Sequence, residues 1–473
     1  MKLGITGTNH LILLTLFVFI SSNAWGGTDW QDPFDTGHLA APSPLGSLKT
    51  AVSEPCTNTA MTSPLALGDV VDRVLCHNPQ SSQAWANARY QAAQVGVAQA
   101  PFLPSVSVNG AAARNVINGP GIDSSYNSLS AGVSLSYLLY DFGGRDAALD
   151  NARQLFAAAS ATQDSVVQNL FLTAIQGYYQ VNATASALAS TLEAERAAKA
   201  SLDAATARYK SGVATPADKL QAQTAYSQAV LNRIRADGDL KTARGNLANL
   251  MGWDANRDFV LQPVAASPAY EQFQSNVGDM IAEARRRRPD LAAAEAQVKA
   301  ADASIRTVEA AGKPSFSLTT NLSYLDKQFG DATKTGAIGV NVTIPLFTGF
   351  SNTYKIRAAQ EQARSSEAAR DQLNLQVALD VWKAYQSLQT ETQSVQSSGD
   401  LVSSAAQNAD VALGRYKAGV GNIIDLITAQ SALASARSQQ IQATFNWDIA
   451  RASLAYAMGQ LDDTHVVTTE KNP

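Results

Sequence analysis

The chain has 473 residues, a formal net charge of −4 and a charged fraction of 16%, against roughly 25% in ordinary soluble domains. This balance, without a basic stripe of interleaved aromatic residues, excludes a nucleic-acid partner. Abundant Ala, Ser and Gln favour close packing between helices over a strongly solvated surface.

The first 24 residues have the pattern of a secretory signal peptide. Lys2 precedes an apolar run, Leu11 to Ile20, and Ser22-Asn23-Ala24 supplies a cleavage site after Ala24. The run is too short to span a bilayer, and no later stretch offers 18 consecutive apolar residues. We therefore predict an exported protein without a transmembrane helix.

Residues 25–66 form a leader rich in Pro, Gly, Ser and Thr, which we expect to be extended. The two cysteines of the chain, Cys56 and Cys76, meet an oxidising compartment after export, so a disulfide is expected. Closing a loop of about 20 residues contributes roughly 3 kcal/mol by loss of chain entropy. Lipidation of Cys56 is the weaker alternative, because Ser53-Glu54-Pro55 is a poor lipidation context.

Four segments show the period of two that is typical of β-strands. They are expected at about residues 104–115, 126–140, 314–325 and 336–347. One face of each is apolar, and the other carries Ser, Thr, Gly and Asn, as suits a wet lumen. Their lengths approach the roughly ten residues of a tilted membrane strand. We predict four transmembrane strands; a half-buried sheet in a soluble sandwich is the alternative.

Four strands are too few to close a barrel, because the smallest membrane barrels have about eight. Open sheet edges are not tolerated in hydrocarbon, so closure requires several chains. Two copies supply eight strands and three supply twelve, and the strand count does not choose between them.

Long helical tracts follow the strands. No proline occurs from Gly144 to Gly212 or from Gly349 to Gly419, and some 70 helical residues reach about 100 Å. Each tract stops at a glycine turn and is followed by a second helix, Thr215–Met251 or Asn422–Met458. Apolar and small residues at a spacing of three to four indicate helix-packing seams without a ligand.

The chain contains an internal two-fold repeat. Arg208-Tyr209-Lys210-Ser211-Gly212-Val213 returns 207 positions later as Arg415-Tyr416-Lys417-Ala418-Gly419-Val420. We assign the first repeat to residues 67–264 and the second to 265–459, each with a helix, two strands and a long helical hairpin. Residues 460–473 are expected to form a flexible tail.

The repeated Arg-Tyr-x-x-Gly turns, the paired Pro-Ser strand starts and the phrases Leu139–Gly144 and Leu346–Gly349 together resemble the TolC family of outer-membrane channel-tunnels. The resemblance covers about 400 residues, from Leu67 to Gly459. The cysteine pair and the phrase Leu75–Pro79 are most similar to the CyaE-like branch of type I secretion.

The resemblance implies an α+β membrane protein and a homotrimer. Twelve strands would form one β-barrel in outer-membrane lipid, continued by a long periplasmic α-helical barrel. The chain would be the exit duct of a tripartite export system, for drug efflux or type I protein secretion. Its partners would be a periplasmic adaptor (membrane fusion) protein and an inner-membrane ABC or RND-type transporter, which supplies the energy; no cofactor is implied.

The resemblance also places the functional sites at the hairpin tips. Asp425 would form a threefold ring at a periplasmic gate, and Asp218 would accept a hydrogen bond from the Tyr416 hydroxyl. The implied adaptor-contacting residues are Arg208, Tyr209, Gly212, Val213, Thr215, Arg415, Gly419, Val420 and Asn422. The alternative is that both aspartates only stabilise helix starts behind the N-caps Thr215 and Asn422, by roughly 1 kcal/mol each.

Three positions depart from the family pattern. Gly421 stands where an Arg is frequent, and Thr428 where a second acidic ring is frequent. Both departures weaken the case for a gate held by charge pairs alone. Thr348 replaces the usual Asp of the strand-to-helix corner.

The sequence disfavours an enzyme. No histidine joins a cluster of metal ligands, and neither a phosphate-binding glycine loop nor a Gly-x-Ser-x-Gly elbow is present, so neither catalytic residues nor a metal is expected. A trimeric coiled-coil adhesin is the other alternative, but its anchor would be one C-terminal segment. The run Arg285–Arg288 is expected to be a solvated helix end, with lipid headgroups as the alternative contact.

Overall fold

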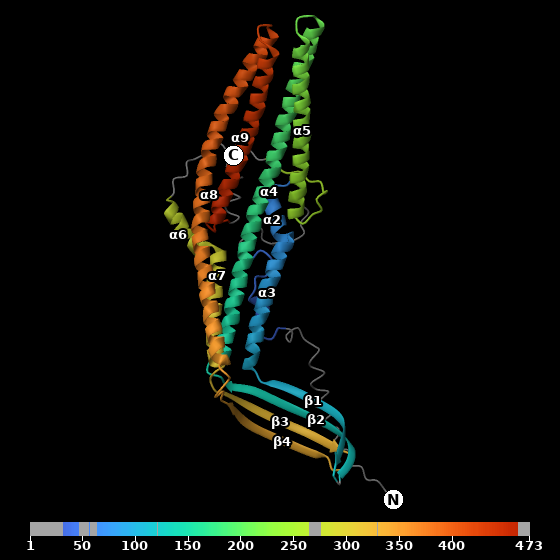
Figure 1. Cartoon of the computed structure of the whole chain (residues 1–473), viewed down its shortest axis with the longest axis vertical. Helices are drawn as coiled ribbons and strands as arrows, with labels where there is room; N and C mark the ends of the chain where they lie inside the picture. The colour runs from blue at the N-terminus through green and yellow to red at the C-terminus, as the bar shows by residue number, and fades with distance from the viewer. Residues whose placement is uncertain are drawn as a thin grey trace. The chain divides into compact units, whose positions relative to one another are not determined.

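The computed structural model describes residues 32–46, 56, 64–120, 122–263, 276–328 and 330–461 (Figure 1). The predicted signal peptide and nearly all of the predicted tail lie outside these residues. The chain divides into two compact units. The first contains the sheet and the helix segments within residues 88–156 and 299–364, and the second contains the hairpin tips.

The sheet of the first unit is antiparallel, with the strand order β1-β2-β3-β4 (Figure 1). Its members are β1 (Ser105–Gly119), β2 (Ile122–Tyr140), β3 (Ser315–Lys327) and β4 (Thr333–Thr343). Each strand overlaps one of the four predicted segments, but β1 ends four residues later than predicted, β2 begins four residues earlier and β4 begins three residues earlier. The predicted end of β4 at residue 347 is wrong, because Pro345 has no N–H for the ladder.

The register of the sheet collects the apolar side chains on one face. Val108 pairs with Val133, Val133 with Leu322, and Leu318 with Val340. This apolar sheet face comprises Val106, Val108, Leu129, Val133, Leu135, Leu318, Leu322, Ile338 and Val340. Most of these side chains are exposed in the single chain, and exposed apolar patches of this kind mark a partner or a membrane.

The opposite face of the sheet is polar. Hydroxyl groups of neighbouring strands bond to one another there, with 2.7 Å between Ser107 and Ser134 and 2.6 Å between Ser323 and Thr335. The two-faced pattern predicted from the sequence therefore exists across all four strands.

The helices repeat the same plan twice. They are α2 (Leu67–His77), α3 (Pro79–Gln99), α4 (Gly144–Lys210), α5 (Pro216–Leu250), α6 (Val277–Arg287), α7 (Pro289–Ala310), α8 (Ser351–Lys417) and α9 (Ile423–Ala457). The long helices α4 and α8 have 67 residues each, and α5 and α9 have 35 each. Pro79 and Pro289 begin new helices because proline lacks the N–H that would continue the preceding one. Among the described residues, no helix combines the length and the apolar character needed to cross a membrane.

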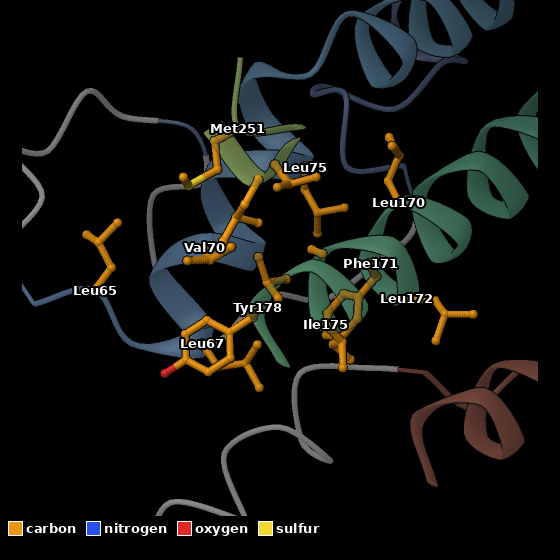
Figure 2. Packing of buried hydrophobic residues seen from close by; sticks show 14 of the residues in the cluster. Leu65, Leu67, Val70, Leu75, Leu170, Phe171, Leu172, Ile175, Tyr178 and Met251 are labelled. Atoms are coloured by element: carbon orange, nitrogen blue, oxygen red, sulfur yellow. The ribbon is translucent and has the colours of Figure 1, made fainter. Parts of the chain in front are cut away.

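Each half of the second unit has its own apolar core. In the first half, side chains from α2, α4 and the end of α5 converge, among them Val70, Phe171 and Met251 (Figure 2). In the second half, α6, α8 and α9 build the equivalent core. Leu170, Leu240 and Leu247 of the first core occupy the repeat positions of Val377, Trp447 and Leu454 in the second. The duplication thus preserves the packing positions as well as the turns.

The described part of the leader is packed and not extended, contrary to the prediction. Asp32 accepts hydrogen bonds from the amides of Thr36 and Gly37 and so starts the short 3-10 helix η2 (Thr36–His38). Further along, the Trp85 indole donates to the Ala41 carbonyl at 2.8 Å, and buried Gln163 donates to the Ser43 carbonyl at 3.3 Å. Helix side chains therefore hold the leader by its backbone.

Arg288 is also placed differently from the prediction of a solvated helix end. Arg285, Arg286 and Arg287 are exposed, but only 9% of Arg288 is. Its guanidinium binds Asp290 at 2.6 Å and Asp380 at 2.9 Å. Burial alone lowers the pKa of Arg288, but the hydrogen bonds and charges of the two carboxylates raise it above its usual value.

Candidate functional site

The hairpin tips are the best candidate site, and both are closed by the same backbone motif. Gly212 (φ +77°) and Gly419 (φ +81°) adopt the left-handed conformation after α4 and α8. The Gly212 amide donates to the Tyr209 carbonyl at 3.0 Å, and the Val213 amide to the Arg208 carbonyl at 3.0 Å. The second tip repeats these bonds, which together form a Schellman helix end. The repeated Arg-Tyr-x-x-Gly-Val motif is therefore the sequence that ends each long helix.

The following helices begin differently in the two tips. Thr215 and Asp218 form a full capping box: the Thr215 hydroxyl accepts from the Asp218 amide, and the Asp218 carboxylate accepts from the Thr215 amide at 2.9 Å. Asn422 accepts from the Asp425 amide at 2.7 Å. The exposed Asp425 carboxylate has no partner among the described residues. Asp425 is thus free to face a lumen or a partner, whereas Asp218 is engaged.

An apolar cluster lies between the two tips. It is formed by Leu202, Ala205, Ala222, Tyr416, Ile423 and Leu426, all of which are buried. The residues come from α4, α5, α8 and α9, so the cluster joins both hairpins of one chain. Burial of these side chains stabilises the paired arrangement of the hairpins.

Tyr416 is the polar member of this tip cluster, and Arg208 covers it. The Arg208 guanidinium carbon lies 4.7 Å from the centre of the Tyr416 ring, and Nη1 donates to the Tyr416 carbonyl at 3.2 Å. The buried Tyr416 hydroxyl has no hydrogen-bond partner among the described residues. Within one chain the Asp218 carboxylate accepts from Thr215, and the predicted bond from the Tyr416 hydroxyl to Asp218, which would hold neighbouring hairpins shut, stays a prediction.

The outer surfaces of both tips are apolar in part. Val213, Leu220, Val420 and Ile424 are each more than half exposed. Of the predicted contact residues, Tyr209, Gly212, Thr215, Gly419 and Asn422 are exposed as well. Arg208, predicted as an adaptor-contacting residue, also contacts the second tip within the chain, and its contact with an adaptor stays a prediction. No local signal in the sequence shows this, since the two residues it connects are 208 positions apart.

The cysteine pair is joined far from the tips. Cys56 and Cys76 form a disulfide with their Cα atoms 5.2 Å apart, and both pack against the first core. The bond ties the leader to the end of α2.

One further acid, Asp448, is half-buried and was not identified from the sequence. Asp448 lies on α9 beside the buried Trp447, and burial raises its pKa to about 6, although the charge of Arg451 opposes this. Lys241 occupies the equivalent position of the first repeat, so the acid is specific to the second. A lone Asp in a helix carries no sequence signal of burial. Among the described residues, no group of acids, histidines or cysteines could hold a metal ion.

Comparison with known proteins gives a consistent result. Residues 70–253 and 280–460 match the family described as outer membrane efflux protein. Protein CyaE of Bordetella pertussis is 30% identical over 95% of both chains. Outer membrane efflux protein BepC of Brucella suis is 26% identical, over 86% of this chain and 88% of the relative.

Solved structures share the fold. The CmeC outer membrane channel of Campylobacter jejuni matches 90% of this chain and 94% of its own, with a TM-score of 0.76 and 18% identity. VceC of Vibrio cholerae matches 83% of this chain and 96% of its own, with a TM-score of 0.74 and 18% identity. The family is one of transport ducts and not of enzymes. The chain therefore belongs to the outer membrane efflux protein family and is an outer-membrane protein, as its resemblance to the TolC family predicted.

Proposed function

We propose that three copies of this chain form the outer-membrane exit duct of a tripartite export system. The observation that carries the proposal is the apolar sheet face, which is continuous across all four strands and exposed in one chain. In a barrel this face would contact lipid, and the Ser, Thr and Asn face would line a wet lumen.

The need for several copies follows from the edges of the sheet. β1 and β4 are the two edge strands in the order β1-β2-β3-β4. Edge N–H and C=O groups would be unsatisfied in hydrocarbon, so β1 of one copy must pair with β4 of another. Three copies give twelve strands, the number that the family resemblance implies.

The hairpin tips are proposed as the gate and as the docking surface of a periplasmic adaptor. In a trimer, Asp425 would occur three times around the narrow end of the tunnel. Such a ring attracts cations, as acidic rings do in cation-selective pores. The exposed apolar residues Val213, Leu220, Val420 and Ile424 supply contact area for the adaptor.

The source of energy and the choice of cargo are assigned to partners. A transporter of the ABC or RND type in the inner membrane would load the duct through the adaptor. The proposed cargo is a drug-like small molecule or a secreted protein, according to the transporter that loads the duct. Isolation of the transporter that co-purifies with the full chain identifies the class.

Single-channel recording in planar bilayers tests the proposal. The wild-type protein should conduct, and D425A should lower cation selectivity and weaken block by multivalent cations. D400N, which removes an exposed acid of α8 distant from the tip, is the matched control. If D425A lowers thermal stability but leaves selectivity and block unchanged, Asp425 is only a helix-start residue.

A further inference from the structure

We propose that Arg208 is the latch that holds the two hairpin tips of one subunit together, through the ring face and the backbone carbonyl of Tyr416. The Tyr416 hydroxyl is not part of this latch. Arg208 acts as a positioning residue: it fixes Tyr416, and Tyr416 fixes the second tip. This role rests on the proposed function, because the contact is a latch only if the tips form a gate.

Two contacts bring the Arg208 side chain onto the second tip. Its Nη1 donates to the Tyr416 carbonyl at 3.2 Å, and its guanidinium carbon lies 4.7 Å from the centre of the Tyr416 ring. Its Nη2 would lie 3.2 Å from a β-carbon at Gly419, so the glycine leaves the space that the guanidinium uses. The Arg208 side chain of the first hairpin therefore contacts the carbonyl and the ring of Tyr416 and occupies the space beside Gly419 in the second hairpin.

The position of these contacts makes them favourable. The Tyr416 carbonyl belongs to the last turn of α8, where helix carbonyls present the negative end of the helix dipole. A cation there is stabilised by the dipole, by the charged hydrogen bond and by the ring quadrupole. The Tyr416 carbonyl already accepts the Gly419 amide at 3.1 Å, so Arg208 adds to the Schellman turn without disrupting it.

The contact is absent in the reciprocal direction. Arg415 and Tyr209 are the repeat counterparts of Arg208 and Tyr416, but no hydrogen bond or cation–π contact joins them in the described part of the chain. Tyr209 is 41% exposed and instead has the Lys219 ammonium 5.7 Å from its ring centre. The motif alone therefore does not create the latch, which depends on the particular packing of the second tip.

The Arg208 contacts help to keep the apolar cluster between the two tips buried. Tyr416 contacts the group that includes Leu202, Ile423 and Leu426. Separation of the two tips would expose these side chains to water and break the Arg208 contacts at the same time. Release of Arg208 is thus coupled to opening of the cluster.

The test is single-channel recording of the full trimer without adaptor. R208Q should raise the fraction of time in the open state by about thirtyfold or more over wild type, the factor expected for losing a charged hydrogen bond and a cation–π contact together. K210Q removes a positive charge from the same helix turn, but Lys210 is exposed and should not open the channel. Equal leak in R208Q and K210Q at equal thermal stability would overturn the latch.

Two pairs of variants locate the contact within Arg208 and Tyr416. Y416F keeps the ring and the carbonyl, whereas Y416L removes the ring, so Y416L should leak more than Y416F. Leak in Y416F equal to that in R208Q would instead assign the latch to the hydroxyl. G419A and G212A place a β-carbon at positive φ, but only G419A meets the guanidinium, so G419A should leak more.

If R208Q fails to assemble, the variants G419A and G212A still test the proposal, because both keep Arg208. Equal leak in G419A and G212A would then contradict the latch. A wild-type protein that forms no channel would contradict the proposed function itself. A conducting wild type with silent R208Q, Y416L and G419A would contradict the latch alone.

Discussion

Tyr209 and Tyr416 occupy the same place in the two repeats, yet 41% of Tyr209 is exposed and only 5% of Tyr416. Both follow an arginine and precede the same Schellman turn. One difference between the two tips lies in the helix after the turn. Ile423 and Leu426, both buried, replace Pro216 and Lys219 of the first tip. The duplicated motif thus determines the backbone of both turns, whereas burial of the tyrosine depends on packing partners outside the motif.

The junctions between short and long helices differ in the same way. Asn78 and Arg288 are repeat counterparts, and both are buried before a proline. Asn78 donates to the Leu250 carbonyl at 3.0 Å, whereas Arg288 forms an ion cluster with Asp290 and Asp380. The first repeat uses a neutral hydrogen bond where the second uses three charges.

The largest effect is expected when Arg288 is given the residue of the first repeat. R288N leaves Asp290 and Asp380 without their cation and should lower the free energy of unfolding by about 3–4 kcal/mol. Thermal unfolding of the detergent-solubilised protein measures this, with R285N, at an exposed position of the same run, as control. Equal midpoints for R288N and R285N would show that the ion cluster is dispensable.

The second largest effect is expected from the disulfide, which only the first repeat has. In the second repeat, Arg286 is the counterpart of Cys76. The double variant C56S/C76S should lose about 3 kcal/mol, because the leader regains its freedom in the unfolded state. A reducing agent should lower the unfolding midpoint of the wild type and leave that of the variant unchanged. Mass spectrometry of the non-reduced mature protein that finds two free thiols would rule out the bond.

Asp448 gives a pH-dependent difference between the repeats. Its pKa of about 6 exceeds its ordinary value of 3.8, so the folded state binds more protons than the unfolded state between these pH values. Below pH 3.8 Asp448 is protonated in both states, and the folded protein does not have to bury its charge. This stability of the folded state is lost as the pH rises from 3.8 through 6. D448N should therefore be more stable than the wild type by about 3 kcal/mol at pH 7.5 and equal to it near pH 3.5. D410N, at an exposed acid of α8, should show no such gap, and a gap for D448N that is constant with pH would refute the titration.

The smallest effect separates the two aspartates at the tips. D218A removes one side of a complete capping box and should cost about 1 kcal/mol. D425A leaves the Asn422 cap intact and removes only an acid near a helix start, which is worth about 0.3–1 kcal/mol. Unfolding midpoints measured side by side should fall further for D218A; a larger fall for D425A would reverse the assignment.

The sequence predicts the backbone of this chain better than its long-range contacts. Proline-free tracts and glycine stops place α4 and α8 within a few residues of their ends, because these signals are local. Strand alternation predicts both faces of the sheet, since side-chain period and register are linked. The predicted end of β4 lies too far along the chain, because the alternation of apolar residues continues from Ile344 across Pro345 to Leu346.

The site was predicted only where its residues act locally. The capping role of Asp218 is readable from Thr215 three positions earlier. The contact of Arg208 with Tyr416, and that of Arg288 with Asp380, depend on helices distant in the chain. A run of four arginines predicts a solvated helix end. Only the packing of α6 against α8 distinguishes Arg288 from its neighbours.

The mass of the purified protein in detergent tests the central claim most directly. With 49.9 kDa per chain before signal removal, the account predicts a single species of about 140–150 kDa by native mass spectrometry, together with cross-linked trimers. A stable monomer inserted in lipid would leave the edges of β1 and β4 unpaired in hydrocarbon. That result would contradict the proposed duct and the gate built on it.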